Sequence, residues 1–280
     1  MVSKTSMRIS SAVVLSLALI VSMVVHEPRF GWAQDAASDA LNKAVASTSR
    51  RPEDAARDKY RHPIETLEFF EMKPDMTVVE IWPGAGWYTD ILAPYLHDRG
   101  KLYVAIPSGE NAAAYRKKLA DDPARFGKVT ITDLDPPDKM EIAPAGSADM
   151  VVTFRNVHNW MRRGHGEQVF KAMYAALKPG GILGVEEHRA DPSKPQDPAA
   201  ASGYVREDYV IRMAEQAGFQ LAGKSEINAN PKDTKDYPKG VWTLPPTLRL
   251  GDTDKVKYLA IGESDRMTLK FIKLNASARP

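Results

Sequence analysis

The chain has 280 residues, 38 of them basic and 36 acidic, and it contains no cysteine, which excludes disulfides and a lipoprotein anchor. Residues 1–33 carry three basic residues and one acidic residue, so the remainder has 35 of each and no formal net charge. Such a chain lacks the positive field that recruits nucleic acid or anionic membranes. We expect a small-molecule partner and no nucleic-acid partner, and the oligomeric state stays open.

The N-terminus has the pattern of an export signal. Lys4 and Arg8 precede an uncharged apolar stretch at residues 12–25, and Gly31 and Ala33 follow it. The stretch is shorter than the about 20 residues that span a bilayer, but it has the length of a signal-peptide core. We expect cleavage after Ala33, a periplasmic or secreted protein, and no stable membrane insertion afterwards. An uncleaved N-terminal anchor is the alternative.

Residues 34–58 are rich in alanine, serine and charge, and they predict a helical linker segment that is docked on the following domain or trails from it. Residues 59–280 are enough for one large α/β domain with a buried core.

From residue 74 onward, short apolar runs alternate with segments of helical periodicity. Predicted strands cover residues 76–81, 101–106, 128–134, 148–154, 182–188, 220–227 and 265–274. Predicted helices cover residues 87–100, 108–122, 166–181 and 206–219. Strands separated by such helices need crossover connections, which indicates a mostly parallel sheet covered on both faces. Ligands of such sheets bind at the carboxyl ends of the strands.

The first predicted strand contains Glu80 and continues as Ile-Trp-Pro-Gly-Ala-Gly. A dinucleotide fingerprint would need a glycine where Thr89 stands and an acidic residue within 101–107, so an NAD oxidoreductase is not favoured. The pattern Glu-x-x-x-Gly-x-Gly instead resembles the first motif of the class I S-adenosylmethionine-dependent methyltransferases. The alternative is that Gly84 and Gly86 only form a tight turn.

The resemblance extends over residues 60–274, through "SADMVVTFRNVHNWM" and "ALKPGGILGVEEHRA". More narrowly, "RHPIETLEFF", "FRNVHNW" and "GVWTLPPTLR" are similar to the exported predicted methyltransferases of bacteria. The resemblance implies a Rossmann-like, seven-stranded, mostly parallel sheet with helices on both faces and an antiparallel last strand. It also implies S-adenosylmethionine as the cofactor and an unidentified small molecule as the methyl acceptor.

By the same resemblance, one set of residues is expected to bind the cofactor. This set consists of Glu80, Trp82, Gly84, Gly86, Tyr88, Asp133 and Arg155. Two positions depart from the family pattern: Trp82 stands where a glycine is usual, and Pro107 and Ser108 follow the second strand where an acidic residue usually holds the ribose. Glu110 or Asn111 could substitute for that acidic residue. Asp133 could equally be a turn or cap residue.

Methyl transfer to a hydroxyl or an amine needs a base that removes the acceptor's proton. His158, just beyond the fourth strand, is placed for this role, and Glu187 and His188 at the end of the fifth strand are further catalytic candidates.

Three residues near His158 are assigned to the acceptor. Asn156 and Asn159 are expected to orient it, as Arg155 also could, and Trp160 is expected to stack on it. The histidine spacing shows no metal motif, so no metal is expected. Residues 226–246 form either a lid or a plain surface loop. The alternative to an enzyme is a non-catalytic, ligand-binding periplasmic protein of the same fold.

Overall fold

In the computed structural model, residues 29–275 and Met1 are described, so the expected signal core at residues 12–25 lies outside the described part. A seven-stranded sheet has the order β3-β2-β1-β4-β5-β7-β6, in which β7 runs antiparallel to both of its neighbours. This topology confirms the predicted Rossmann-like sheet with an antiparallel last strand. The strands are β1 Thr77–Ile81, β2 Lys101–Ile106, β3 Thr130–Asp133, β4 Ala148–Phe154, β5 Leu177–His188, β6 Phe219–Ser225 and β7 Arg266–Lys273.

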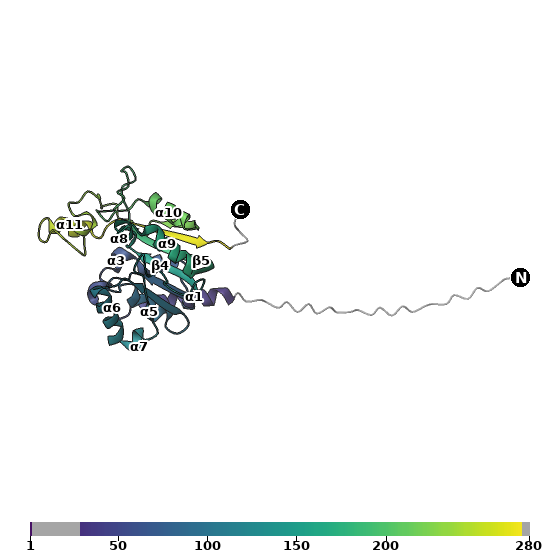
Figure 1. The fold of residues 1–280 in the computed structure, drawn as a ribbon. Helices are drawn as coiled ribbons and strands as arrows, with labels where there is room; N and C mark the ends of the chain where they lie inside the picture. The colour runs from purple at the N-terminus through teal and green to yellow at the C-terminus, as the bar shows by residue number, and fades with distance from the viewer. Residues whose placement is uncertain (2–28, 276–280) are drawn as a thin grey trace.

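Helices cover both faces of this sheet (Figure 1). The helices are α1 Arg29–Val45, α2 Pro52–Ala55, α3 Asp58–Arg61, α4 Pro63–Phe69, α5 Thr89–Leu96, α6 Glu110–Asp121, α7 Pro123–Phe126, α8 Val157–Arg162, α9 Gly166–Ala176, α10 Glu207–Gln216 and α11 Lys255–Ile261, with a 3₁₀ turn η1 Gly240–Thr243. Neighbouring strand residues point to opposite faces, so Val78 packs with α1, α4, α5 and α6, whereas Val79 packs with α8, α9 and α10.

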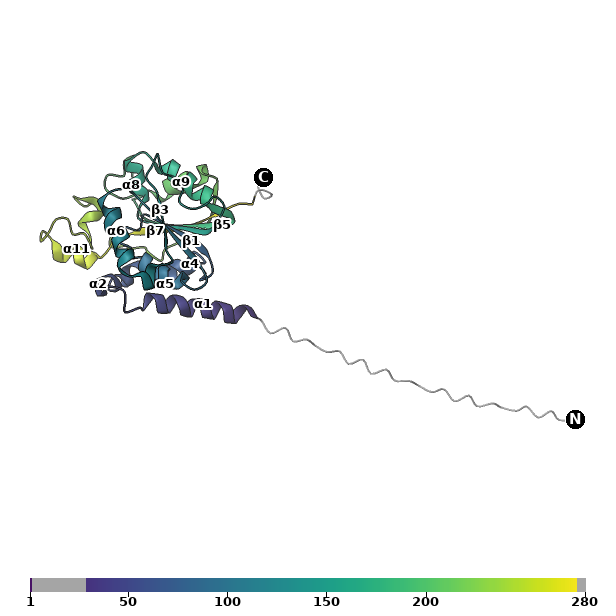
Figure 2. The same ribbon diagram turned by 60° about the horizontal axis from the view of Figure 1, so that its bottom comes forward.

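The segment before α2 is docked on the domain. Helix α1 lies along one face of the molecule beside α5 (Figure 2), and its Leu41 and Ala44 are buried in the same cluster as the α5 residues Ile91 and Leu92. The expected cleavage position after Ala33 falls inside α1. Among the described residues, no helix combines the length and apolar character that a membrane span needs.

The largest difference from the predicted element boundaries lies between α9 and β5. The helix expected from residue 166, with a stop at the Pro-Gly-Gly segment 179–181, ends at Ala176, and β5 begins at Leu177, which pairs with Ala148 of β4. Pro179 and the glycines after it cannot continue a helix, and Gly180 has a φ of +80°. The Pro-Gly-Gly segment is therefore an irregular start of the strand rather than a helix end.

Candidate active site

The turn after β1 lies at the carboxyl edge of the sheet and is held in a left-handed backbone conformation at three positions. The φ values are +45° at Trp82, +61° at Gly84 and +83° at Gly86. A Cβ on Gly86 would lie 2.8 Å from Lys118 Nζ and 3.1 Å from the Tyr115 ring, whereas a Cβ on Gly84 would meet no atom within 4 Å. A side chain at Gly86 would have to displace the end of Lys118 and crowd the Tyr115 ring, so of the two glycines only Gly84 faces space that a ligand could use.

Glu80 lies beneath this turn and is fully buried. Its Oε2 accepts a 2.6 Å hydrogen bond from Thr89 Oγ1, which is also 2.8 Å from the Tyr115 hydroxyl. Burial, partly offset by the Thr89 hydrogen bond, raises the pKa of the Glu80 carboxyl to about 7. The side chain is therefore poised between its neutral and charged forms near neutral pH.

Trp82 extends from the end of β1 across the sheet edge. Its Nε1 donates a 2.9 Å hydrogen bond to the Leu134 carbonyl, just past β3, and the Arg163 guanidinium lies 5.2 Å from its ring centroid. A non-glycine residue at positive φ carries strain of about 1–3 kcal/mol, which the surrounding contacts must offset. The indole therefore forms a fixed wall over the ends of β1 and β3.

The ends of β2 and β3 lie side by side, since Ile106 pairs with Asp133. Asp133 is partly exposed and accepts bonds from Arg116 at 2.6 Å and Lys139 at 3.1 Å. Glu110 begins α6 and is exposed, and the side chain of Asn111 lies outside the described part. An adenine contact by Asp133 stays a prediction, as does a ribose contact by Glu110 or Asn111.

Between the ends of β1 and β4 lies a small recess, walled mainly by Trp82, Pro83, Trp87, Tyr88, Phe154 and Arg155. Tyr88 stacks on Phe154, and its hydroxyl donates a 3.2 Å hydrogen bond to Glu186 Oε2. Burial raises the pKa of Tyr88 well above its usual value, so the phenol is a neutral donor. The enclosed space measures about 20 Å³, which is room for about one water and far below the roughly 300–1,000 Å³ of pockets for whole small molecules.

Arg155 follows β4 directly, with a φ of +61°. Its backbone N–H donates a 2.7 Å hydrogen bond to the Glu186 carbonyl, which joins the ends of β4 and β5. Its Nη1 lies 3.7 Å from Glu186 Oε1 and has no hydrogen-bond partner, although the atom is buried. Burial lowers the pKa of the guanidinium from its usual value, an effect that the Glu186 charge opposes.

His158 and Glu187 form a buried pair where β4 and β5 end. His158 Nδ1 lies 3.0 Å from Glu187 Oε1, and the His158 backbone N–H donates to Glu187 Oε2 at 3.1 Å. The carboxylate thus fixes both the ring and the first turn of α8, in the way that an acid orients a catalytic histidine. The second ring nitrogen, Nε2, is the atom left for an acceptor's proton.

His188 lies beside this pair, with its ring centroid 5.4 Å from that of His158. Its Nδ1 lies 2.5 Å from Ser264 Oγ, and its backbone N–H donates to Glu187 Oε1. Burial, together with the His158, Arg155 and Arg266 charges, lowers the pKa of His188 well below 6.5. His188 is therefore neutral near pH 7.

Among the residues that the structure describes, His158, Glu187 and His188 are the one group that could hold a metal ion, with ligand atoms within 4.8 Å of one another. The histidine spacing in the sequence did not indicate a metal site here, because the members of the group come from two different strand ends. Both Nδ1 atoms already have protein partners, and positive Arg155 and Arg266 lie close by. This arrangement fits proton transfer better than cation binding.

Not all of the residues that were expected to contact the methyl acceptor lie where they could do so. Trp160 has no exposed surface and packs between Trp82 and Phe170, so the prediction that it stacks on a substrate is wrong; it belongs to the core of one sheet face. Asn156 Nδ2 donates to the Ile81 and Trp82 carbonyls, so its amide nitrogen ties β4 to β1, and a contact of this residue with the acceptor stays a prediction. Asn159 is partly exposed and stays a candidate.

The segment 226–246 covers His158. Trp242 packs its edge against the His158 ring with centroids 5.8 Å apart, and Arg162 and Arg249 lie over the same indole. Asn228 anchors the start of the segment through hydrogen bonds to Thr66 Oγ1 and Thr268 Oγ1 at 2.9 and 3.0 Å. The segment is thus a cover over the end of β4, not an isolated surface loop.

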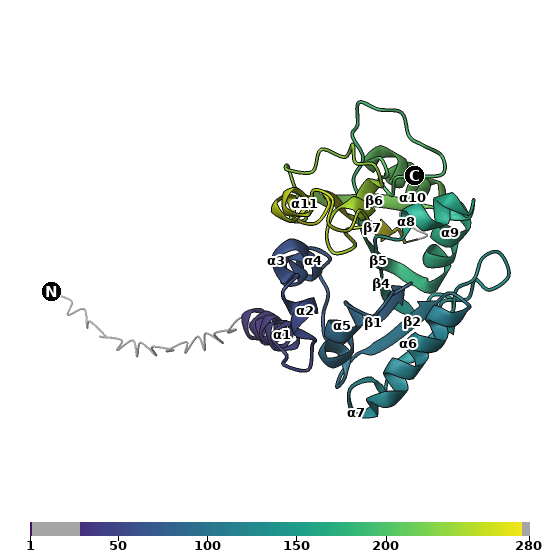
Figure 3. The same cartoon turned by 90° about the vertical axis from the view of Figure 1, so that its left-hand side faces the viewer.

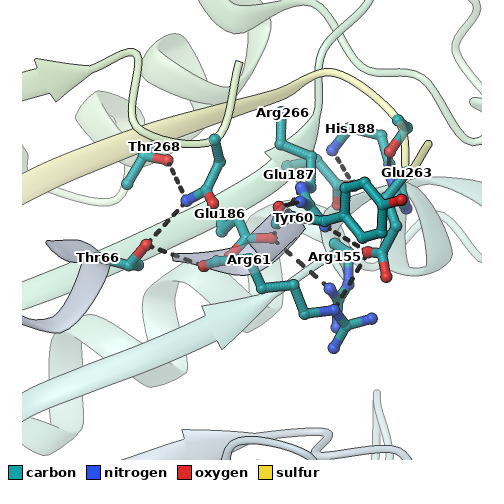
Figure 4. Close-up of polar contacts among 12 residues, drawn as sticks. Tyr60, Arg61, Thr66, Arg155, Glu186, Glu187, His188, Glu263, Arg266 and Thr268 are labelled. Carbon is teal, nitrogen blue, oxygen red and sulfur yellow. Dashed lines mark hydrogen bonds and ion pairs between the residues drawn. The ribbon is translucent and has the colours of Figure 1, made fainter. Parts of the chain in front are cut away.

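A buried ion-pair network, of which Figure 4 draws the part around Glu186, Glu263 and Arg266, was not predicted from the sequence. Glu186 contacts Arg266 Nε at 3.2 Å, and Glu263 contacts Arg266, Arg61 and Arg57 at 2.9, 3.2 and 2.7 Å. Figure 3 shows α3 between α1 and α11, which is how Arg57 and Arg61 reach the start of β7. The only feature of the sequence that pointed to this network was the acidic pair at residues 186–187.

The fold is similar to that of several solved methyltransferases. A methyltransferase from Aquifex aeolicus, described as S-adenosylmethionine-dependent, has a TM-score of 0.55 and 16% identity over 85% of this chain and 98% of its own. A putative sarcosine dimethylglycine methyltransferase from Galdieria sulphuraria has a TM-score of 0.51 and 11% identity over 79% and 88%. The [4+2]-cyclase SpnF has a TM-score of 0.53 and 15% identity over 76% and 80%.

No protein-family model matches the sequence, and no curated protein matches it either. At sequence identities this low, the structural similarity shows a shared fold. The presence of a cyclase among the similar structures illustrates that this fold serves more than one chemistry, so the function must be argued from the site.

Proposed function

We propose that the protein is an exported, S-adenosylmethionine-dependent methyltransferase that acts on a small molecule, with His158 as its general base. The observation that carries this proposal is the buried His158–Glu187 pair, which lies where β4 and β5 end, at the same sheet edge as the Gly84 turn. The cofactor would lie along the open side of that turn, with Glu80, Trp82, Tyr88, Asp133 and Arg155 around it. Glu187 would act by orienting His158, and the neutral His188 would border the acceptor.

The donor group supplies an electrophilic methyl carbon, and the protein has to align an acceptor atom with that carbon and exclude water. Trp242 covers His158 on one side, which supports a closed acceptor site. His158 would take the proton of a hydroxyl or amine through Nε2, and Glu187 would stabilise the imidazolium that forms.

A non-catalytic binding protein is the second candidate, and one observation favours it. The Trp82 indole is hydrogen-bonded across the ends of β1 and β3, and β2 ends without a carboxylate for the ribose. A lost charge-assisted hydrogen bond lowers affinity by roughly ten- to a hundredfold.

A direct assay separates the two candidates. The purified protein is incubated with S-adenosylmethionine carrying a labelled methyl group and with panels of small phenols, acids and amines, and S-adenosylhomocysteine release is measured. Acceptor-dependent release supports the enzyme. Binding of the cofactor without release from any acceptor class favours the binding protein.

Export rests on the leader sequence and needs its own test. N-terminal sequencing of the protein from its native host is expected to give a start at or near Gln34 in the extracytoplasmic fraction. An intact chain from Met1 in the cytosol would contradict export. Cleavage there would keep Leu41 and Ala44 of α1 in their buried contacts.

A further inference from the structure

Two arginines lie on the cover above His158. The guanidinium groups of Arg162 and Arg249 lie 5.1 and 4.9 Å from the centroid of the Trp242 ring, whose edge packs against His158. Arg162 stands four residues after His158 in α8, so the two side chains lie on the same face of the helix, one turn apart. Both arginines are exposed, whereas the His158 side chain is only 5% exposed. An acceptor that approaches His158 past this cover therefore meets two positive charges first.

Neither guanidinium is neutralised by a carboxylate. In the part of the chain that the structure describes, no carboxylate oxygen lies within 4 Å of either group, and Arg162 Nη2 donates only to the Ala201 carbonyl, at 3.4 Å. Asp197 accepts a hydrogen bond from the Ala201 backbone N–H instead, at 2.7 Å. Asp252, three residues after Arg249, pairs with a lysine at the start of α11. Both positive charges are thus available to a ligand.

Arginines without an ion pair are uncommon in this protein. Of the arginines whose side chains the structure describes, only Arg99, Arg162, Arg163 and Arg249 lack one. Arg163 lies 5.2 Å from the centroid of the Trp82 ring. Three of the four therefore lie on indoles at the carboxyl edge of the sheet, whereas Arg99 precedes β2 at the opposite edge. This distribution points to a ligand at the carboxyl edge rather than to a general surface charge.

The carboxylate that contacts His158 belongs to Glu187, and it determines which end of a ligand would point inward. Glu187 has no exposed surface, and it accepts from the His158 ring and from the backbone N–H groups of His158 and His188. Because the two guanidinium groups lie on the outer side of His158 and this carboxylate lies beneath it, a negatively charged group is attracted outward and repelled from the base. The uncharged hydroxyl or amine of the same ligand would then face His158 Nε2.

The position of the guanidinium groups on Trp242 suits them to bind an oxyanion. A guanidinium over an indole face keeps its N–H donors, which lie in the guanidinium plane, free for a carboxylate or a phosphate. Such pairs are frequently bidentate, which fixes the orientation of the bound group. The ring contact also holds the long side chain in place, so less freedom is lost when the anion binds.

We propose that the methyl acceptor is an acid, and that Arg162 and Arg249 bind its oxyanion group about one helical turn, roughly 5.4 Å, from the atom that His158 deprotonates. The oxyanion is a carboxylate or a phosphate, since the same donors bind both. The role of this acid as a methyl acceptor rests on the proposed function, whereas its binding at the two arginines does not.

Calorimetric titration of the purified protein, with and without S-adenosylhomocysteine, tests the binding with rigid probes. 4-Hydroxybenzoate and phenyl phosphate carry the two oxyanions, and 4-hydroxybenzamide and phenol are their uncharged counterparts. We expect each acid that fits to bind about tenfold more tightly than its counterpart. This preference should shrink as the salt concentration rises, because salt screens exposed charges.

Replacing the arginines should remove the preference. We expect Arg162→Met and Arg249→Met each to weaken acid binding by about three- to fivefold, as for one exposed charge pair, and the double variant to bind acids no better than uncharged probes. Methionine keeps an apolar stem over the indole, so binding of the uncharged probes should not change. Replacing both arginines by lysine, which keeps the charges but not the planar donors, should retain part of the preference.

Arg99→Met is the matched control, because Arg99 is also exposed and without an ion pair, but lies before β2. Thermal unfolding checks the fold, and all variants should melt close to the parent, since the replaced side chains are exposed. Should the double variant not fold, the two single variants carry the test.

The binding and turnover results separate this proposal from the proposed function. Loss of the acid preference in the double variant, with Arg99→Met like the parent, supports the site, and the acid that binds more tightly identifies the oxyanion. Release of S-adenosylhomocysteine with 4-hydroxybenzoate, with a KM that rises in the variants while kcat changes little, supports the acid as the acceptor.

Two results overturn the proposal: an acid preference that is unchanged in the double variant, and a parent that binds acids no better than uncharged probes under either condition. Methylation of 4-hydroxybenzamide or phenol as fast as of 4-hydroxybenzoate also overturns it, although the protein would then still be a methyltransferase. An acid preference that depends on both arginines, with no methyl transfer to any acceptor, contradicts the proposed function and leaves the acid-binding site in place.

Discussion

The two halves of the sheet's carboxyl edge are built in different ways. At the ends of β1, β2 and β3, the shape is set by backbone: Gly84 and Gly86 at positive φ, and the Trp82 indole bonded to the Leu134 carbonyl. At the ends of β4 and β5, the shape is set by charged side chains, with His158 on Glu187 and Arg155 on Glu186. The first half leaves open space at Gly84, whereas the second is covered by Trp242.

This difference indicates that the two halves of the edge have different roles. A backbone turn recognises a ligand by its shape and does not depend on a change in the protonation of a side chain. Such a turn suits a cofactor whose structure is the same in every catalytic cycle. A buried pair of titratable groups can move a proton, which suits the reacting acceptor. Changes at the His158–Glu187 pair should therefore affect turnover, and changes in the β1 turn should affect cofactor binding.

The largest effect is expected from His158→Asn, which removes the proposed base. With a hydroxyl or amine acceptor, we expect kcat to fall roughly 10²–10⁴-fold with little change in cofactor affinity. His165→Asn is the control, since its ring contacts Gln168 away from the site. A variant that keeps more than about a tenth of the parental kcat would remove His158 from the mechanism.

The next effect concerns stability and Glu80. Its folded pKa of about 7 lies above the ordinary carboxyl value, so the folded state binds more protons than the unfolded state between about pH 4.5 and 7. Stability should therefore fall as pH rises through this window, by on the order of 3 kcal/mol, and stay level above it.

Glu80→Gln should remove this fall, because the amide cannot ionise and can still accept from Thr89. Urea unfolding at pH 5 and pH 8 measures the difference, with the exposed Glu215→Gln as the control. The same pH dependence in Glu80→Gln and the parent would show that Glu80 ionises normally in the fold.

A smaller effect is expected from Gly84→Ala, which places a methyl group in the open side of the turn. We expect cofactor affinity to fall by about tenfold, equivalent to about 1.4 kcal/mol. Gly146→Ala is matched in backbone strain, because its φ is +64° and its Cβ would also meet no atom within 4 Å. Equal cofactor affinities of the two variants would mean that the turn does not contact the cofactor.

The smallest effect is expected from metal removal. Since both Nδ1 atoms of His158 and His188 have protein partners, we expect dialysis against EDTA to leave kcat and thermal stability unchanged. A loss of activity that zinc or iron(II) restores would show that the His158, Glu187 and His188 group binds a metal ion.

The sequence predicted the sheet well, because each strand is a short apolar run followed by a polar turn, and the topology places those turns at one edge. The same rule predicted that His158 and Glu187 lie close together at this edge. The sequence could not predict the buried ion-pair network, because that network depends on β7 pairing His188 with Arg266, and on α3 bringing Arg57 and Arg61 to Glu263. It also misplaced Trp160, because the sequence does not show which side of α8 faces the core.

The most direct test of the central claim is calorimetric titration of the purified protein with S-adenosylmethionine and S-adenosylhomocysteine. We expect saturable binding of both ligands, with one molecule per chain and weaker binding to Gly84→Ala than to Gly146→Ala. The absence of binding at millimolar concentrations of either ligand would contradict it, and would leave a methyltransferase fold that serves another ligand.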